Sequence, residues 1–437
     1  VSGGFVTDNR GRIAVARTTM SASMASGRPS EVWHDSSSSA WVQVAASNMQ
    51  ARISGFADKT VVESARARGR VERDVISLWD LLPSQRVAGL SAQFGVPLIA
   101  SSAFSIDPRL AALKKWAGGI DAISSSHPVP ASSDASFRRY FRFRVGNDSF
   151  IVMDAPPENE NSRPFVQVAG FLESMGLNAA RVIEANLDDG FLLLSDLGSR
   201  QYLDELLDDP DSAPRLYGDA LSALLTMQRS GVPMQAQLPP YDDAMLRFEM
   251  SLFHDWLCGT HLDISLSEAD EREWQSACDM LVANALDQPR VFVHRDYHSR
   301  NLMVTATDNP GILDFQDAVE GPLTYDLVSL LKDCYVKWPS EQVWQWALDF
   351  HAGLDASMRS RVDETQFRRF FELMGVQRHL KAAGIFCRLN HRDGKPGYLA
   401  DIPRTLAYVV EVAARHTELL ELGEFVSDRV LSHLPSA

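Results

Sequence analysis

The chain has 437 residues, 45% of them hydrophobic, and a formal net charge of −15 at pH 7. Its length and apolar content allow more than one globular unit and exclude a chain that is disordered throughout. The negative charge, with no basic stripe of interleaved aromatic residues, argues against nucleic acid and anionic lipid as partners. No stretch approaches 18 consecutive apolar residues and the first thirty residues hold no apolar signal-peptide core, so we predict a cytoplasmic protein.

Four cysteines are spread widely along the chain and include no CxxC pair. This spacing argues against both a zinc site and a disulfide framework, and it predicts buried, reduced thiols.

Residues 1–106 differ in composition from the rest of the chain. They contain 11 Lys and Arg against 8 Asp and Glu, whereas the remaining residues contain 31 against 49. Ten of the first fifty residues are serine, and no period of 2 or 3.6 is sustained. We expect a low-complexity, mostly disordered leader with one short helical stretch at 71–82. Because the chain begins with Val1, an over-extended upstream start is a further hypothesis for this segment.

Residues 107–198 predict a small antiparallel sheet with one inserted helix. A first helix is expected from Asp107, which has proline after it and glycines at the end of the segment. SFRRYFRFRV and SFIVMDAPP alternate around a turn at 146–148 and predict one hairpin, while ARVIEAN and FLLLSDLG around LDDG predict a second. The run PFVQVAGFLESMG between the hairpins has helical spacing.

Residues 199–437 predict a larger helical unit. One helix follows an Asp-Ser cap and ends at Gly231. Further amphipathic segments cover about 241–258, 267–286, 324–336, 340–354, 363–390 and 401–421. The expected fold is therefore α+β, with a sheet-containing N-lobe and a helical C-lobe, and a cleft between such lobes is a usual place for a small ligand.

Three oxygen-bearing side chains are predicted to meet in the C-lobe. NLMVTATDNPGILDF has the pattern of a hairpin with its turn near DNPG, which would bring Asn301 and Asp314 together at the open end. Asp296 follows the apolar strand VFV and can reach the same place. Hard oxygen ligands suit Mg²⁺ carrying substrate phosphates, and a cation would offset the repulsion between the two carboxylates.

The segments HRDYHSRN and DFQ resemble the catalytic loop H-R-D-x-x-x-x-N and the metal motif of the protein-kinase-like fold. This resemblance implies that Asp296 orients the acceptor hydroxyl and takes its proton, that Asn301 and Asp314 hold Mg²⁺, and that His294 braces the loop. EGPLTYDLVSLL follows within a few residues, so there is no activation segment to support a peptide substrate. GPLTYDLVSLL instead resembles the aminoglycoside phosphotransferase family of small-molecule kinases, in which the aspartate corresponding to Asp326 anchors the catalytic loop.

The expected nucleotide site departs from the usual kinase pattern. SSDASF (132–137) contains no glycine where a glycine-rich loop is expected, although its backbone N–H groups can still point at a phosphate. Met153 and Asp154 stand where the strand lysine of a kinase would be. By fold analogy, the backbone at 195–197 would meet the adenine. The residues expected at the nucleotide are Ser133, Ser136, Arg138, Tyr140, Asp196 and Leu197.

The strand FRRYFRFR offers a substitute for the missing lysine. Its alternation places Phe141 and Phe143 on one face, and Arg138, Tyr140 and Arg142 on the other. If the second face looks into the cleft, Arg138 could bind phosphate oxygens bidentately. A solvated basic face of the strand is the alternative.

Late in the chain, QRHLKAAGIFCRLNHRDGKPGYLADIPR places charged residues and glycines between two apolar-periodic helices. We expect a connection that binds a sugar, with carboxylate and amide groups for hydroxyls and Arg or Lys for an acidic substituent. A solvated loop is the alternative. The side chains expected at this site are Arg388, Asn390, Arg392, Asp393 and Tyr398.

Together with DASFRRYFR, VMDAPP and VHRDYHSRNLM, this segment is similar to one branch of that family: the cell-wall-recycling kinases that phosphorylate N-acetylmuramate and N-acetylglucosamine at the anomeric hydroxyl. The resemblance covers about residues 107–437. It implies an enzyme that uses ATP and Mg²⁺ to make a sugar α-1-phosphate for peptidoglycan precursors. The alternatives are a kinase of another small hydroxylated metabolite or aminoglycoside, and an inactive pseudokinase scaffold. These motifs are compatible with either sugar as acceptor and with either ATP or GTP as donor. They are also compatible with any oligomeric state.

Overall fold

A computed structural model describes residues 5–7, 13–15, 107–133 and 137–434. Within the first 105 residues it describes one antiparallel pair, β1 (Phe5–Thr7) and β2 (Ile13–Val15). The helical stretch expected at 71–82 lies outside the described residues. Residues 106–437 form one compact unit. The division of this unit into lobes at residue 198 stays a prediction.

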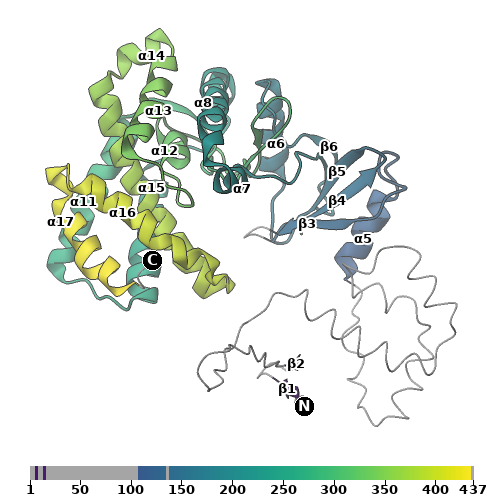
Figure 1. The fold of residues 1–437 in the computed structure, drawn as a ribbon, viewed down its shortest axis with the longest axis horizontal. Coiled ribbons are helices and arrows are strands. Elements are labelled where there is room, and N and C mark those ends of the chain that lie inside the picture. Colours follow the sequence, from purple (N-terminus) through teal and green to yellow (C-terminus); the bar gives the residue numbers. More distant parts are fainter. Residues whose placement is uncertain (1–4, 8–12, 16–106, 134–136, 435–437) are drawn as a thin grey trace, which may run out of the picture. The chain divides into compact units, whose positions relative to one another are not determined.

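A five-stranded antiparallel sheet forms the first part of this unit (Figure 1). In spatial order its strands are β3 (Val129–Ser133), β4 (Arg139–Val145), β5 (Asp148–Asp154), β7 (Phe191–Ser195) and β6 (Val182–Asn186). Both predicted hairpins are therefore confirmed. The turn of the second hairpin needs glycine, because Gly190 has a φ of 74° and a Cβ there would lie 1.9 Å from the Ala155 carbonyl oxygen.

Two helices cover the two faces of this sheet. α5 (Pro108–Ala117) is capped by Asp107, and its Leu113 packs in a small core with Phe141 and Phe143. α6 (Arg163–Ser174) packs in the main core of the protein. The inner strand β7 contributes alternate residues to each core, which explains its uninterrupted apolar sequence FLLL.

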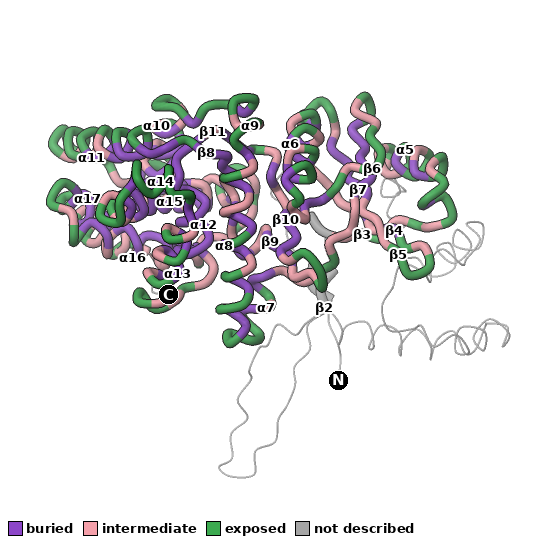
Figure 2. The backbone as a smooth tube through the Cα atoms, turned by 90° about the horizontal axis from the view of Figure 1, so that it is seen from above, coloured by how far each residue is buried: buried purple, intermediate pink, exposed green. Residues whose placement is uncertain are grey.

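The rest of the unit is mostly helical, as predicted (Figure 1). Its longer helices are α7 (Tyr202–Asp208), α8 (Ala213–Ser230), α10 (Asp243–Leu252), α11 (Glu268–Asp287), α12 (Tyr325–Leu331), α13 (Ser340–Gly353), α15 (Glu364–Asp393) and α16 (Ile402–Ala413). The thirty-residue α15 is the central helix, and much of it is buried among its neighbours (Figure 2). Several of its buried side chains are polar or charged, and such residues are rarely buried unless they have partners or a function.

Four short strands frame the predicted catalytic segment. β8 (Arg290–Val293) pairs with β11 (Val319–Pro322), and β9 (Leu302–Met303) pairs with β10 (Gly311–Ile312). The second pair confirms the hairpin predicted around DNPG. The loop 294–301 runs between β8 and β9, so its two ends are fixed by separate strands.

Three boundaries predicted from the sequence are wrong. The helix expected over 363–390 extends to Asp393, where part of the connection was expected, and Gly394 caps it in the left-handed conformation (φ 66°). The helix expected over 324–336 ends at Leu331. The helix expected over 401–421 ends at Ala413 and is followed by the short α17 (Leu420–Glu424).

All four cysteines are free and buried, as predicted. Over the described ranges, no helix is both long and apolar enough to cross a membrane.

Candidate active site

Two buried carboxylates hold the loop 294–301 in place. Asp326, from α12, is fully buried and accepts hydrogen bonds from the backbone N–H groups of His294 (2.6 Å) and Arg295 (2.9 Å). Burial raises the pKa of Asp326 to about 7, although the two N–H donors oppose this shift. At the other end of the loop, Asp333 accepts a hydrogen bond from the Ser299 N–H group (2.9 Å). Sequence reasoning missed Asp333, which lies outside the recognised motifs.

The loop and the β9–β10 hairpin bring Asp296, Asn301 and Asp314 to one cavity of about 1420 Å³. Asn301 Nδ2 donates to the Asp296 backbone oxygen (3.0 Å) and lies 3.4 Å from Asp314 Oδ2. Asp314 has a φ of 61°, which is uncommon for a residue with a side chain and typical of functional positions. The side chains of Asn301 and Asp314 therefore meet as the hairpin pattern predicts, and Asp296 lines the same cavity. The chemical roles of the three residues stay a prediction.

A buried cluster of charged side chains lies close enough to Asp296 to affect its ionisation. Glu249, from α10, forms an ion pair with Arg295 and lies 3.0 Å from Lys381 Nζ on α15. Lys381 also donates a hydrogen bond to Tyr325 Oη (2.8 Å). Burial opposes ionisation of Asp296, but the surrounding charges, Lys381 foremost, outweigh it and lower its pKa. The carboxylate of Asp296 is thus kept ionised at neutral pH.

The strand β4 shows the predicted alternation. Its two phenylalanines pack against α5, whereas Tyr140 and Arg142 line the cavity. Arg138, just before β4, places Nη1 3.6 Å from Asp314 Oδ1 and Nε 3.7 Å from Glu160 Oε2. The strand and the residue before it therefore bring two arginines to the cavity.

Arg142 interacts with the segment after β7, where the adenine was expected. It donates hydrogen bonds to Asp196 Oδ1 (3.0 Å) and to the Gly198 carbonyl oxygen (2.6 Å). Burial opposes ionisation of Asp196, but the hydrogen bond from Arg142 outweighs it and lowers the pKa. Leu197 also lines the cavity. Ser133 ends β3, and its side chain and all of Ser136 lie outside the described residues.

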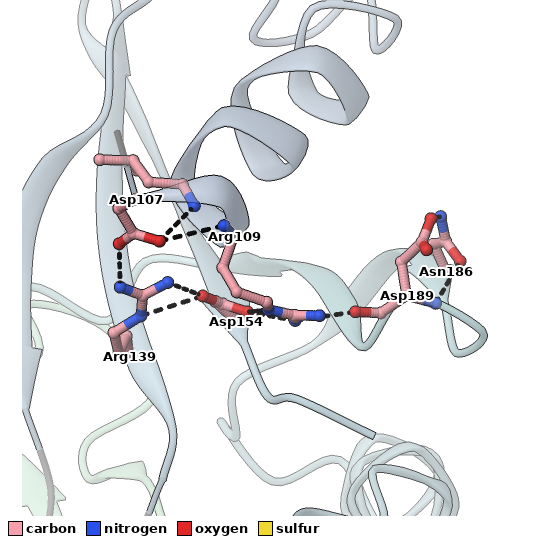
Figure 3. Close-up of polar contacts among 7 residues, drawn as sticks. Asp107, Arg109, Arg139, Asp154, Asn186 and Asp189 are labelled. Atoms are coloured by element: carbon pink, nitrogen blue, oxygen red, sulfur yellow. Dashed lines mark hydrogen bonds and ion pairs between the residues drawn. The ribbon is translucent and has the colours of Figure 1, made fainter. Parts of the chain in front are cut away.

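The expectation that Asp154 stands in the place of a nucleotide-binding cation is wrong. Asp154 is fully buried on the α5 side of the sheet, where it accepts hydrogen bonds from Arg109 Nε (3.1 Å) and Arg139 Nε (3.0 Å) (Figure 3). Asp107 binds Arg139 from the other side. The strand's alternation directs Met153 to the opposite face, into the main core. Asp154 is therefore neutralised within the N-lobe and does not repel a nucleotide.

One face of α15 lines the far end of the cavity. Arg378, Lys381, Ile385, Arg388 and Arg392 follow one another at spacings of 3 and 4 and lie on one side of the helix. Sequence reasoning placed Arg388 and Arg392 in a segment expected to connect two helices, although the helix predicted over 363–390 included Arg388, and it missed Arg378 and Lys381. The helical spacing of the charged residues was the signal that could have found them.

The remaining residues predicted for the acceptor differ in position. Asp393 and Tyr398 line the cavity, and Arg392 is paired with Asp393 through two hydrogen bonds of 2.7 and 2.9 Å. Tyr398 stacks on Phe386 with ring centroids 5.7 Å apart. Asn390 does not line the cavity, because the turn of the helix directs it off the lining face, so its predicted place in the site is wrong.

Residues 128–365 match the sequence profile of the phosphotransferase enzyme family (APH). The chain belongs to this family. It is 49% identical over 299 residues to the N-acetylmuramate/N-acetylglucosamine kinase of Pseudomonas putida, covering 68% of this chain and 87% of that protein. It is 48% identical over 319 residues to the protein of the same name from Pseudomonas aeruginosa, covering 71% of this chain and 91% of that protein.

Among solved structures, this phosphotransferase resembles an ethanolamine kinase from Plasmodium vivax with a TM-score of 0.52 and 10% sequence identity, covering 77% of this chain and 96% of that one. The likeness agrees with the predicted protein-kinase-like fold.

Proposed function

We propose that the protein is an ATP-dependent sugar kinase that phosphorylates the anomeric hydroxyl of N-acetylmuramate and N-acetylglucosamine during recycling of cell-wall amino sugars. The observation that carries the proposal is the convergence of Asp296, Asn301 and Asp314 in one cavity of a chain from the phosphotransferase family. The names of its relatives at 48–49% identity support the acceptor. We place the reaction in the cytoplasm, where ATP is available.

Asp296 is the residue that we assign to the acceptor hydroxyl. Its lowered pKa keeps it ionised and able to accept a hydrogen bond from the hydroxyl. An anomeric hydroxyl is more acidic than an ordinary alcohol, so a weak carboxylate base mainly needs to orient it and take its proton as the phosphoryl group transfers. Alignment of the two reactants then supplies much of the rate enhancement.

Asn301 and Asp314 are the residues that would hold Mg²⁺. Their amide and carboxylate oxygens are the hard ligands that this ion prefers. No cluster of three or more His, Cys, Asp or Glu side chains that could hold a metal occurs among residues 107–133 and 137–434, so the remaining ligands would come from nucleotide phosphates and water. When bound, the ion would neutralise charge on the phosphates.

Arg138 is our candidate for the cation that replaces the strand lysine. Met153, at the lysine's position, is buried in the main core and carries no charge. Arg138 instead lines the cavity beside Asp314 (3.6 Å), the residue that we assign to Mg²⁺. A guanidinium there can bind two phosphate oxygens at once.

ATP consumption against a panel of free sugars, choline and aminoglycosides tests the proposal. We expect turnover with N-acetylmuramate and N-acetylglucosamine and loss of the sugar's reducing end, because a phosphate at carbon 1 blocks ring opening. Asp296→Asn should abolish turnover, whereas Asp349→Asn, an exposed carboxylate on α13 outside the cavity, should not. A product that keeps its reducing end would refute the assigned position. Turnover with none of the compounds would favour the pseudokinase alternative.

A further inference from the structure

The acceptor end of the cavity contains an arginine whose bonding capacity is not met by the protein. Arg388 lines the cavity, and its Nε is buried without a hydrogen-bond partner among the described residues. Burial lowers the pKa of Arg388, and the nearby charge of Arg392 lowers it further. A buried donor on a charged group is costly when it has no partner, so such a group in a cavity is suited to a ligand that supplies one.

The other cations on the same face of α15 have partners. Lys381 pairs with Glu249, and Arg392 pairs with Asp393 through two hydrogen bonds. Arg378 donates to the Ser329 hydroxyl at 2.5 Å. Carboxylates offset the charges of Lys381 and Arg392, whereas Arg378 is held in place by a neutral hydroxyl. Arg388 is therefore the residue of this face best able to pair with a negative group on the acceptor.

The position of Arg388 along α15 matches the dimensions of a substituted sugar. Lys381 is close enough to Asp296 to be the foremost charge that lowers its pKa. Arg388 follows seven residues later on the same side of the helix, about 10 Å along its axis. This separation can be spanned by three parts in series. They are a sugar ring with its anomeric hydroxyl at Asp296, a substituent that carries a carboxylate, and an extended arginine side chain.

The walls near Arg388 suit the rest of a sugar. Tyr335, Phe386 and Tyr398 line the cavity and pack against one another, with the Phe386 ring centroid 6.1 Å from that of Tyr335 and 5.7 Å from that of Tyr398. The Arg300 guanidinium lies over two of these rings, 3.9 Å from the Tyr335 centroid and 5.3 Å from that of Tyr398. Aromatic surfaces bury the apolar faces of a pyranose, and cations between them favour an anionic substituent.

We infer that Arg388 is a specificity-determining residue that binds a carboxylate on the acceptor. The inference rests on the proposed function and sharpens it. N-Acetylmuramate carries a lactyl carboxylate, whereas N-acetylglucosamine has a free hydroxyl at that position. Arg388 therefore raises kcat/KM for the first sugar and contributes little to that for the second.

Arg388→Met and Arg388→Lys, assayed with both sugars, test this inference. We expect Arg388→Met to lower kcat/KM for N-acetylmuramate by a factor on the order of 30, the low end of the effect of truncating a hydrogen-bonded charge pair, because Arg388 is half-buried. The kcat/KM for N-acetylglucosamine should change by only a few-fold. Arg388→Lys should retain part of the preference. The matched control is Arg368→Met on the same helix, where the arginine is half-buried and paired with Glu364 outside the cavity. It should leave the ratio of the two kcat/KM values unchanged.

An equal loss with both sugars, or an unchanged ratio, would overturn the inference, since a purely structural role affects both acceptors alike. Calorimetric binding of each sugar to Asp296→Asn, with and without Arg388→Met, gives the same comparison without turnover. A preference for N-acetylmuramate that disappears with Arg388→Met supports the inference even if phosphorylation fails, and a preference that persists refutes it. Failure of both sugars as substrates of the unaltered protein would count against the proposed function alone.

Discussion

Asp326 anchors the catalytic loop, and its replacement by asparagine should separate the activity of the protein from its stability. The carboxylate accepts both the His294 and the Arg295 N–H groups. An asparagine offers one oxygen, and its amide would direct N–H groups at the second backbone donor. The loop must then move, and a displacement of about 1 Å at a catalytic group costs on the order of 100-fold in rate.

The effect of Asp326→Asn on stability follows from the pKa of this carboxyl. Burial raises the pKa from 3.8 to about 7, so the ionised form is penalised in the folded protein. The penalty is absent below pH 3.8, grows as the pH rises, and is complete above pH 7, where it reaches about 4 kcal/mol. Asparagine carries no charge and escapes this penalty, but it loses a charge-assisted hydrogen bond of about 1.5–3 kcal/mol. The free energy of unfolding at pH 8 should therefore lie within about 2 kcal/mol of the unaltered protein.

Two measurements check this reasoning for Asp326→Asn. The first is kcat with saturating ATP and sugar, which should fall about 100-fold while the protein stays folded. The second is the free energy of unfolding in urea at pH 5 and pH 8. The difference between the variant and the unaltered protein should shift in favour of the variant by about 3 kcal/mol from pH 5 to pH 8. Near-normal turnover would refute the anchoring role. A stability difference that does not change with pH would refute the buried, perturbed carboxylate.

Three further predictions concern stability. Lys332 Nζ is buried without a hydrogen-bond partner among the described residues, and burial lowers its pKa to about 8. Lys332→Met should raise the free energy of unfolding by about 2 kcal/mol at pH 7, a gain that fades as the pH rises from 8 to 10.5; an equal gain in urea unfolding at pH 7 and pH 10 would contradict this. Asp154→Asn leaves Arg109 and Arg139 without their buried partner and should cost about 3 kcal/mol or more in the same assay, whereas an unchanged midpoint would show that the pairing is not needed. Gly384→Ala should cost about 2 kcal/mol or more, because its Cβ would lie 2.2 Å from the Leu252 carbonyl carbon. In the control Gly375→Ala the nearest atom is 3.7 Å away, so a thermal melt should show no loss, and equal effects of the two substitutions would refute the crowding argument.

The parts of the fold that were predictable are those fixed by local patterns. Alternation and turn chemistry placed both sheet hairpins and the β9–β10 hairpin, since a period of 2 and a glycine or proline turn act over a few residues. The same logic brought Asn301 and Asp314 to one place. Prediction from local patterns failed at the C-terminal end of α15. The charged residues that line the cavity from this helix resemble, in composition, those of a solvent-exposed loop.

The parts that were not predictable depend on elements far apart in the sequence. Glu249 meets Lys381 across more than a hundred residues, and neither lies in a recognisable motif. Asp154 was misplaced for a related reason: its partner Arg109 comes from α5, an element outside the sheet hairpins. The alternation of residues along a strand predicts which side chains share a face of the sheet. It does not predict which face lines the cavity.

In the proposed mechanism, the arginines around β4 take the place of the strand lysine that other kinases have. Successive residues point to opposite faces, so Arg139 neutralises buried Asp154 on the α5 side, while Arg138 and Arg142 enter the cavity. Arg142 is bound to Asp196 and thereby ties β4 to the segment expected at the adenine. Arg138 lies beside Asp314 and brings positive charge to the place where nucleotide phosphates would collect. Because one strand provides both the internal neutralisation and the cations of the cavity, the absence of a lysine at position 153 does not by itself argue for an inactive protein.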